Sequence, residues 1–134
     1  MQSATQTVPI SNNTLWTGRF MSALAVLFML LDGVVKLFNP PPVVESMTQL
    51  GYAENLALAI GIIEIICVAV YVIPRTSVLG AILLTGYLGG AIASHVRIGS
   101  DLFSLVFPVI LGLLLWGGLY LRDEQLRKLI PLRS

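Results

Sequence analysis

Charged residues are scarce in this chain of 134 amino acids. They make up 11% of the sequence, against roughly 25% in a soluble globular domain. Small soluble domains bury only a modest part of their surface and need polar groups to cover the rest. Eight Lys and Arg with seven Asp and Glu are too few for that, which excludes an ordinary soluble domain. The net charge of +1 offers none of the positive excess that nucleic-acid binding requires, so we expect no nucleic-acid partner.

Cysteine and histidine each occur once, as Cys67 and His95. A single cysteine excludes an intramolecular disulfide, a CxxC redox pair and a multi-cysteine metal site. One histidine with scattered carboxylates is too little for a metal-ligand set. The sequence also lacks GxGxxG, haem-ligand and cluster-ligand motifs. We therefore expect no metal site, and no cofactor is evident from the sequence.

Hydrophobic residues, in contrast, make up 56% of the chain, and the mean hydropathy is +0.87. Four apolar stretches have about the 20 residues needed to cross a hydrocarbon core of roughly 30 Å. They cover residues 15–38, 56–73, 78–96 and 102–120. None shows the alternating polarity of membrane β-strands. The sequence therefore predicts an all-α fold, an integral membrane four-helix bundle whose main partner is the lipid membrane.

The longest connection, residues 39–55, follows the first stretch. Prolines, which suit the first turn of a helix, open it, and Gly51, which suits a helix C-terminus, stands near its end. Apolar residues at helical spacing share one face between them: Val43, Val44, Met47 and Leu50. We expect a short amphipathic helix on the outer surface of the bundle. It is either an ordered connector or a lid over a site.

The spans divide the chain into a polar N-terminal tail at residues 1–14, a four-helix domain at 15–121 and a charged C-terminal tail at 122–134. An even number of spans puts both chain ends on one side of the membrane, and Lys and Arg favour the cytoplasmic side. The side of the termini holds most of them: Arg19, Arg75, Arg122, Arg127, Lys128 and Arg133. Lys36 and Arg97 belong to the opposite, outer side. We therefore expect both termini in the cytoplasm and a multi-pass protein of the cell membrane.

Small residues recur every fourth position in the third stretch. Such residues let membrane helices approach closely. One series is Gly86, Gly90 and Ser94, and a second beside it is Thr85, Gly89 and Ala93. We expect this helix to be the crowded centre of the bundle or to face a partner subunit.

Six ionisable residues lie toward the outer side of the spans. Each costs about 2.5–3.5 kcal/mol at the middle of a membrane helix, so such residues are functional candidates. They are Asp32, Lys36, Glu64, His95, Arg97 and Asp101. One interpretation is a structural network in which Asp32 pairs with Lys36, and Glu64 with Arg97 or His95. The other is a polar pocket that opens outward and binds a ligand through these six residues.

Glu64 is the strongest candidate for a functional residue, because no opposite charge lies within reach on its own helix. Its partner must come from another helix or from a bound group. His95, at a helix end, is typical of a solvated or capping histidine. Tyr87 and Trp116 lie where aromatic packing is the default expectation.

Several short motifs also occur in an order typical of a known family. They are Asp32-Gly33-Val34-Val35-Lys36-Leu37-Phe38, Leu50-Gly51-Tyr52, Gly61 with Glu64, Ile73-Pro74-Arg75-Thr76, Leu79-Gly80-Ala81, and Gly89-Gly90-Ala91 before His95. Through these motifs the chain resembles the DoxX-like family of small bacterial membrane proteins with four helices, from Gly18 to Leu126. The resemblance implies a bacterial cytoplasmic membrane. It makes the matching positions site candidates: Gly33, Lys36, Glu64, Pro74, Arg75 and His95.

The wider group is named for a subunit of a thiosulfate:quinone oxidoreductase, and some relatives are tied to thiol redox balance, so the resemblance brings a quinone into consideration. Our leading hypothesis is an accessory or small-hydrophobic-ligand-binding protein for a quinone- or lipid-like molecule, acting as a homo-oligomer or with a membrane partner subunit. The alternative is a membrane-embedded enzyme, or a subunit of a quinone-linked oxidoreductase, with Glu64 and His95 transferring protons. The missing cofactor motif favours the first, and the lone Cys67 argues against dithiol chemistry by this chain alone.

Overall fold

A computed structural model describes residues 11–53 and 56–130, and the regular structure in these ranges is helical. The long helices are α2 (Asn12–Phe38), α4 (Leu56–Val72), α5 (Ser77–Arg97) and α6 (Leu102–Arg122). The short ones are α3 (Pro41–Leu50), η1 (Pro74–Thr76) and α7 (Glu124–Leu129). The all-α four-helix bundle with a short helix after its first span is confirmed. Of the two expected tails, residues 1–10 and 131–134, which include Arg133, lie outside the described residues.

Local sequence explains where the helices begin and end. The Ser11 side chain accepts a hydrogen bond from the backbone N–H of Thr14, which satisfies one of the free donors at a helix start. This cap starts α2 at Asn12, three residues before the expected apolar stretch. Pro41 occupies the first turn of α3, and Gly51 ends that helix with φ of 84°, a left-handed conformation that glycine adopts without strain. The prolines and glycines of the long connection therefore give the expected short helix.

The lengths and polarity of the helices fit a lipid environment. Within residues 11–53 and 56–130, three segments are long and apolar enough to cross a membrane: Asn12–Phe38, Pro74–Arg97 and Leu102–Arg122. α4 is also apolar but has 17 residues, or about 26 Å at 1.5 Å per residue. Large apolar side chains cover the outside of the bundle, such as Phe20 (69% exposed) and Leu113 (66% exposed). The chain is a helical membrane protein.

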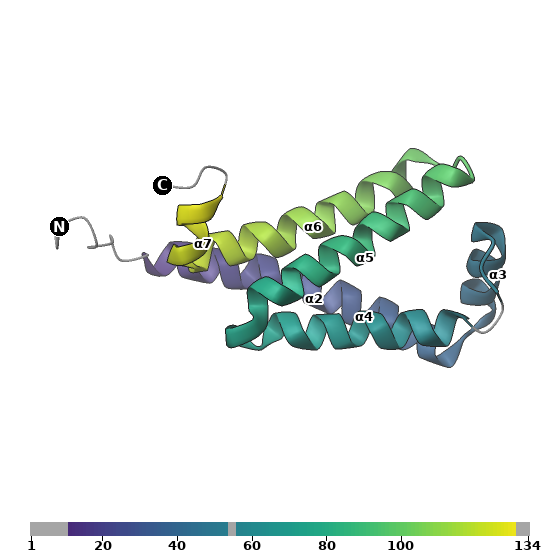
Figure 1. Ribbon diagram of the computed structural model, residues 1–134, viewed down its shortest axis with the longest axis horizontal. Helices are drawn as coiled ribbons and strands as arrows, with labels where there is room; N and C mark the ends of the chain where they lie inside the picture. Colours follow the sequence, from purple (N-terminus) through teal and green to yellow (C-terminus); the bar gives the residue numbers. More distant parts are fainter. Residues whose placement is uncertain (1–10, 54–55, 131–134) are drawn as a thin grey trace.

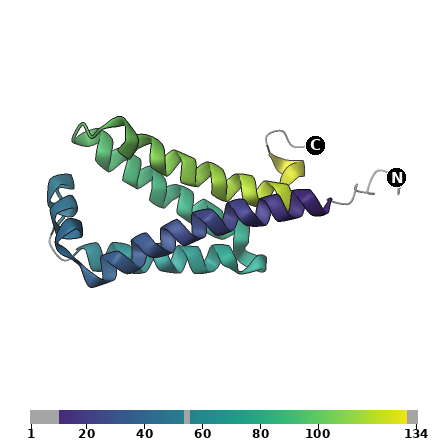
Figure 2. The same cartoon turned by 180° about the vertical axis from the view of Figure 1, so that it is seen from behind.

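The long helices form two pairs that diverge. α2 and α5 each pack against both α4 and α6. In Figure 1, α2 lies beside α4 and α5 lies beside α6 where the bundle opens. Figures 1 and 2 show the pairs meeting at the end of the bundle where α7 lies and separating toward the opposite end, where α3 lies across them. We call these the α7 end and the α3 end. The start of α2 and the end of α6 both lie at the α7 end.

Glycines mark the places where the helices touch backbone to backbone. A Cβ added at Gly118 would lie 2.7 Å from the carbonyl oxygen of Gly18, so α2 and α6 make contact there. A Cβ at Gly61 would lie 2.8 Å from the carbonyl oxygen of Gly33, which fixes α2 against α4. A Cβ at Gly80 would collide with the backbone of Tyr71, at the contact of α4 with α5. The contact of Gly33 with Gly61 holds one pair together, and the other two contacts join that pair to the second pair.

A chain of buried hydrogen bonds reinforces the α7 end. Arg122 donates to the Ser22 hydroxyl at 3.2 Å, Ser22 lies 2.7 Å from the Tyr71 hydroxyl, and Tyr71 donates to the carbonyl of Leu115 at 2.6 Å. Ser22 and Tyr71 are 6% and 1% exposed. Buried polar groups must be paired, so this chain locks α2, α4 and α6 in one arrangement.

The glycines of α5 do not make a crowded centre, one of the two arrangements that their spacing predicted, and the other, a face toward a partner subunit, stays a prediction. A Cβ added at Gly86, Gly89 or Gly90 would meet nothing within 4 Å. The prediction of a crowded centre was wrong because these residues lie in the half of α5 where the helix pairs have separated. Of the glycines in the fourth span, Gly118 does make a close helix contact.

Candidate functional site

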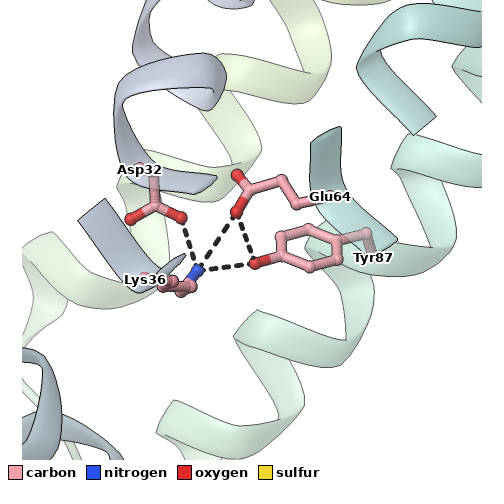
Figure 3. A network of polar contacts seen from close by, with 4 residues as sticks. All are labelled: Asp32, Lys36, Glu64 and Tyr87. Atoms are coloured by element: carbon pink, nitrogen blue, oxygen red, sulfur yellow. Dashed lines mark hydrogen bonds and ion pairs between the residues drawn. The ribbon is translucent and has the colours of Figure 1, made fainter. Parts of the chain in front are cut away.

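Four polar side chains from three helices meet between the separated pairs. Lys36 on α2 lies at the centre, with its Nζ 2.5 Å from Oδ2 of Asp32, 2.6 Å from the Tyr87 hydroxyl and 3.2 Å from Oε1 of Glu64. The Tyr87 hydroxyl donates to the same Glu64 oxygen at 2.9 Å. Figure 3 shows the four side chains pointing toward one another. We call this group the Lys36 network.

The Lys36 network is largely shielded from the surroundings. The Glu64 side chain is 1% exposed and that of Lys36 is 16% exposed, while Asp32 is 55% exposed. Moving an unpaired charge into a low-dielectric interior costs several kcal/mol, and attraction within the pair must offset this. Lys36 supplies that attraction to both carboxylates, so Glu64 can be buried in the span.

The local sequence places these groups in contact. Asp32 and Lys36 are four residues apart, so they lie on one face of α2. Gly33 and Gly61 bring the backbones of α2 and α4 together, and a Cβ at Gly61 would lie 2.9 Å from that of Lys36. The long Lys36 side chain can therefore reach Glu64 on the neighbouring helix and Tyr87 beyond it.

A cavity of about 540 Å³ opens beside the Lys36 network. All four network residues line it, and α3 contributes to its wall through Ser46, Met47 and Leu50. Its apolar lining includes Phe28, Met29, Leu88, Phe103, Phe107 and Leu111. A volume of this size, mostly apolar with a few convergent polar groups, is typical of small-molecule sites.

The glycines and aromatic rings give the cavity its shape. Gly86 and Gly90 line it, and their missing side chains leave the space open. Phe28 of α2 and Phe107 of α6 meet edge to face, with ring centroids 5.8 Å apart, so these rings bridge the two pairs along one side. The small residues of α5 therefore contribute volume to the cavity instead of contact between helices.

Two polar contacts hold α3 and its following loop over the α3 end of the cavity. Arg97 donates to the carbonyl oxygen of Leu50, the last residue of α3. The Tyr52 hydroxyl lies 2.5 Å from the Ser94 hydroxyl. Because Arg97 and Ser94 belong to α5, both contacts tie the first connection to the opposite helix pair. The amphipathic helix therefore forms part of the cavity wall and is tied to α5 by these contacts.

Of the six ionisable residues predicted as a ligand site, four line the cavity and two do not. Asp32, Lys36 and Glu64 belong to the Lys36 network. His95 lines the cavity but its Nδ1 lies 2.9 Å from the Ser100 hydroxyl. His95 is eight residues beyond Tyr87 on α5, or about 12 Å along the helix axis.

The other two members of the six do not line the cavity. Arg97 bonds to α3, and Asp101 accepts a hydrogen bond from the Ser104 hydroxyl at 2.7 Å. The expected pairing of Glu64 with Arg97 or His95 is therefore wrong, because both lie at the α3 end and Lys36 reaches Glu64 first. The partner of Glu64 does come from another helix, as expected.

Tyr87 is the member of the network that the sequence interpretation missed. It was assigned to aromatic packing, although a buried tyrosine hydroxyl needs a hydrogen-bond partner. A usable signal was present: Tyr87, Gly90, Ala91 and Ser94 share one face at helical spacing, and small residues next to a tyrosine leave its hydroxyl accessible. Trp116, assigned in the same way, donates from its ring N–H to the Thr85 hydroxyl at 2.6 Å.

The Lys36 network offers hydrogen-bonding and charged groups to a molecule in the cavity. Among the described residues, no three His, Cys, Asp or Glu side chains lie together as metal ligands would. Cys67 is buried in the hydrophobic core beside Val68 and Tyr71. The Lys36 network therefore brings two carboxyl groups, one ammonium and one phenol to the cavity, which His95 and Tyr52 also line.

Comparison with known proteins identifies the family of the chain. No curated protein and no solved structure is significantly similar to it. The sequence model of the DoxX-like family matches residues 20–118, which include α4 and α5 entirely, most of α2 and α6, and the whole Lys36 network. The match extends over most of the chain, which therefore belongs to the DoxX-like family.

Proposed function

We propose that this protein binds a small amphiphile, quinone- or lipid-like, in the cavity between its helix pairs. The observation that carries the proposal is the 540 Å³ cavity with the charged Lys36 network on its otherwise mostly apolar wall. The apolar residues suit a hydrocarbon or ring body, and the network suits one polar head. Burying the Glu64 carboxyl group beside the Lys36 ammonium costs free energy, and such costly polar groups inside a membrane span are functional candidates.

Native mass spectrometry of the gently extracted protein tests the proposal. We expect the wild type to retain a small molecule that Glu64→Gln loses, because this substitution changes a network oxygen on the cavity wall. Arg75→Gln is the matched control, since Arg75 is exposed and does not line the cavity. Retention unchanged in Glu64→Gln, or no bound molecule in any sample, would contradict the proposal. The same spectra report whether the chain is a homo-oligomer or carries a partner subunit.

A second candidate is a subunit of a quinone-linked oxidoreductase, in which the network transfers protons to or from a ligand. The unbroken contacts from Tyr87 through Glu64 and Lys36 favour it, because proton transfer requires groups in hydrogen-bond reach. His95, bonded to Ser100, would then act separately at the far end of the cavity. Quinol turnover by membranes that contain the protein, abolished in Glu64→Gln, supports this candidate, and unchanged turnover contradicts it.

We also propose that both termini face the cytoplasm of a bacterial cell. The start of α2 and the end of α6 share one end of the bundle, and most Lys and Arg belong to that end. The cavity would then open near the outer surface. Single cysteines introduced at Gln125 and at Thr48, in a Cys67→Ser background, test this with a membrane-impermeant thiol reagent on intact cells. We expect labelling at position 48 and protection at position 125, and the reverse pattern would contradict the orientation.

A further inference from the structure

The Lys36 ammonium has no hydrogen left for a ligand. An ammonium carries three donors and no acceptor. Lys36 directs them to Oδ2 of Asp32, Oε1 of Glu64 and the Tyr87 hydroxyl, at 2.5, 3.2 and 2.6 Å. The Lys36 ammonium therefore offsets carboxylate charge within the network but has no free N–H to donate to a molecule in the cavity.

The Tyr87 hydroxyl is used in the same way. Its one hydrogen goes to Oε1 of Glu64 at 2.9 Å, and its oxygen accepts from Lys36. The phenol of Tyr87 thus has no donor for a ligand either. All four donor hydrogens of Lys36 and Tyr87 are taken up within the network.

The acceptors, in contrast, are in excess. The four contacts use Oδ2 of Asp32 and Oε1 of Glu64 and leave out Oδ1 of Asp32 and Oε2 of Glu64. An ionised carboxylate offers about four lone-pair positions over its two oxygens. Two carboxyl groups therefore face one ammonium in the network. The carboxyl oxygens outside these four contacts can accept a hydrogen bond from a donor on a ligand.

We propose, on the basis of the amphiphile-binding function above, that the cavity selects molecules whose head donates hydrogen bonds, such as a hydroxyl or an ammonium. A head that only accepts, such as a ketone or an ether, leaves its oxygen unpaired against acceptors, which is costly in an apolar cavity. A carboxylate head likewise brings only acceptors to a site whose donors are already used. For a quinone-type ligand, the reduced, hydroxyl-bearing form is the one that fits.

Matched ligands of equal size test this selectivity. The wild-type protein in nanodiscs is incubated separately with 1-dodecanol, its isomer methyl undecyl ether, dodecylamine or dodecanoate at pH 7. Bound ligand is counted by native mass spectrometry and corrected with empty nanodiscs. We expect dodecanol or dodecylamine to be retained about tenfold more than the ether and the carboxylate, because one unmade buried hydrogen bond reduces affinity by about this factor.

Two variants show whether the network is responsible. Asp32→Asn replaces an acceptor with an amide that also donates, and the 55% exposed side chain tolerates the change, so we expect the preference over the ether to narrow severalfold. Asp101→Asn is the control, because Asp101 lies at the α3 end and does not line the cavity. Its preference should equal that of the wild type.

The outcomes separate this inference from the function on which it rests. Equal retention of alcohol and ether, or preference for the ether, overturns the donor-head selectivity while amphiphile binding stands. The same holds if Asp32→Asn leaves the preference unchanged. Failure of all four ligands to bind overturns both proposals. Retention of dodecylamine alone, or of dodecanol alone, supports the selectivity and shows which donor head is bound.

Discussion

The hydroxyl of Tyr87 lies 2.6 Å from Nζ of Lys36 and joins the two helix pairs where they have already separated. Lys36 belongs to the α2–α4 pair and Tyr87 to the α5–α6 pair. The contact is therefore a polar bridge beside the cavity, and its loss affects both the separation of the pairs and the site.

Removal of the bridge should destabilise the protein measurably. For Tyr87→Phe we expect a loss of about 1–3 kcal/mol, because Lys36 and Glu64 each lose a buried hydrogen-bond partner. Thermal unfolding in detergent measures the change. Tyr120→Phe is the matched control, since the Tyr120 hydroxyl makes no hydrogen bond within the described part of the chain. Equal stability of the two variants would contradict the role given to Tyr87.

Removal of the cation should cost more than removal of the whole ion pair. Lys36→Met leaves Glu64 buried without its charge partner, for which we expect about 3–5 kcal/mol of destabilisation. The double variant Lys36→Met with Glu64→Leu removes both charges and should recover much of this loss, since apolar replacements of buried pairs are often tolerated. Unfolding by denaturant compares the two. A double variant less stable than Lys36→Met would show that the pair is not coupled as described.

Filling the cavity should abolish binding and leave the fold intact. Gly90→Leu places a side chain into the cavity that Gly90 lines, where a Cβ meets nothing within 4 Å. We expect retention of 1-dodecanol to fall at least about tenfold. Gly89→Leu is the control, because Gly89 is equally uncrowded but lies outside the cavity lining. Loss of binding in both variants would indicate a general effect on α5.

Alanine substitutions at two glycines of α5 should change the stability of the protein in opposite directions. Gly80→Ala forces a Cβ against the backbone of Tyr71, and such overpacking costs about 1–3 kcal/mol. Gly86→Ala meets open space and gains helix propensity, so stability should stay equal or rise by up to about 1 kcal/mol. Melting temperatures of the two variants decide the point. A stable Gly80→Ala would mean that α4 and α5 are farther apart than described.

Weakening the attachment of α3 should increase its mobility. Tyr52→Phe removes the contact with the Ser94 hydroxyl, worth about 0.5–1.5 kcal/mol. We expect amide hydrogen exchange in residues 41–50 to become severalfold faster, while exchange in α6 stays unchanged. Mass spectrometry of proteolytic fragments measures both segments. Faster exchange throughout the chain would point to global destabilisation instead.

The sequence predicted the helices well because their limits are set locally. Prolines and Gly51 mark the ends of the first connection, and apolar length marks the spans. The burial of Glu64 in a span also predicted a partner on another helix. Identifying that partner required the rotation and tilt of three helices, which no local pattern contains.

Glycine spacing was misleading for the same reason. The sequence of α5 shows regularly spaced small residues, but it does not show how far away the neighbouring helix is. Gly80 touches α4, whereas Gly86 and Gly90 line empty space. Small residues thus allow close helix contact in one half of α5 and leave room for the cavity in the other half. Which of the two roles a glycine has depends on how far the helix pairs have separated at its position.

The contacts of Gly18 with Gly118 and of Gly80 with Tyr71 join the two pairs near the α7 end, and this has a mechanical consequence. Beyond these contacts the helices extend for about 22–30 Å. A rotation of about 5° at the contacts would therefore displace their far ends by about 2–3 Å. We therefore expect substitutions at these backbone contacts to change the width of the cavity, although they lie at the opposite end of the bundle.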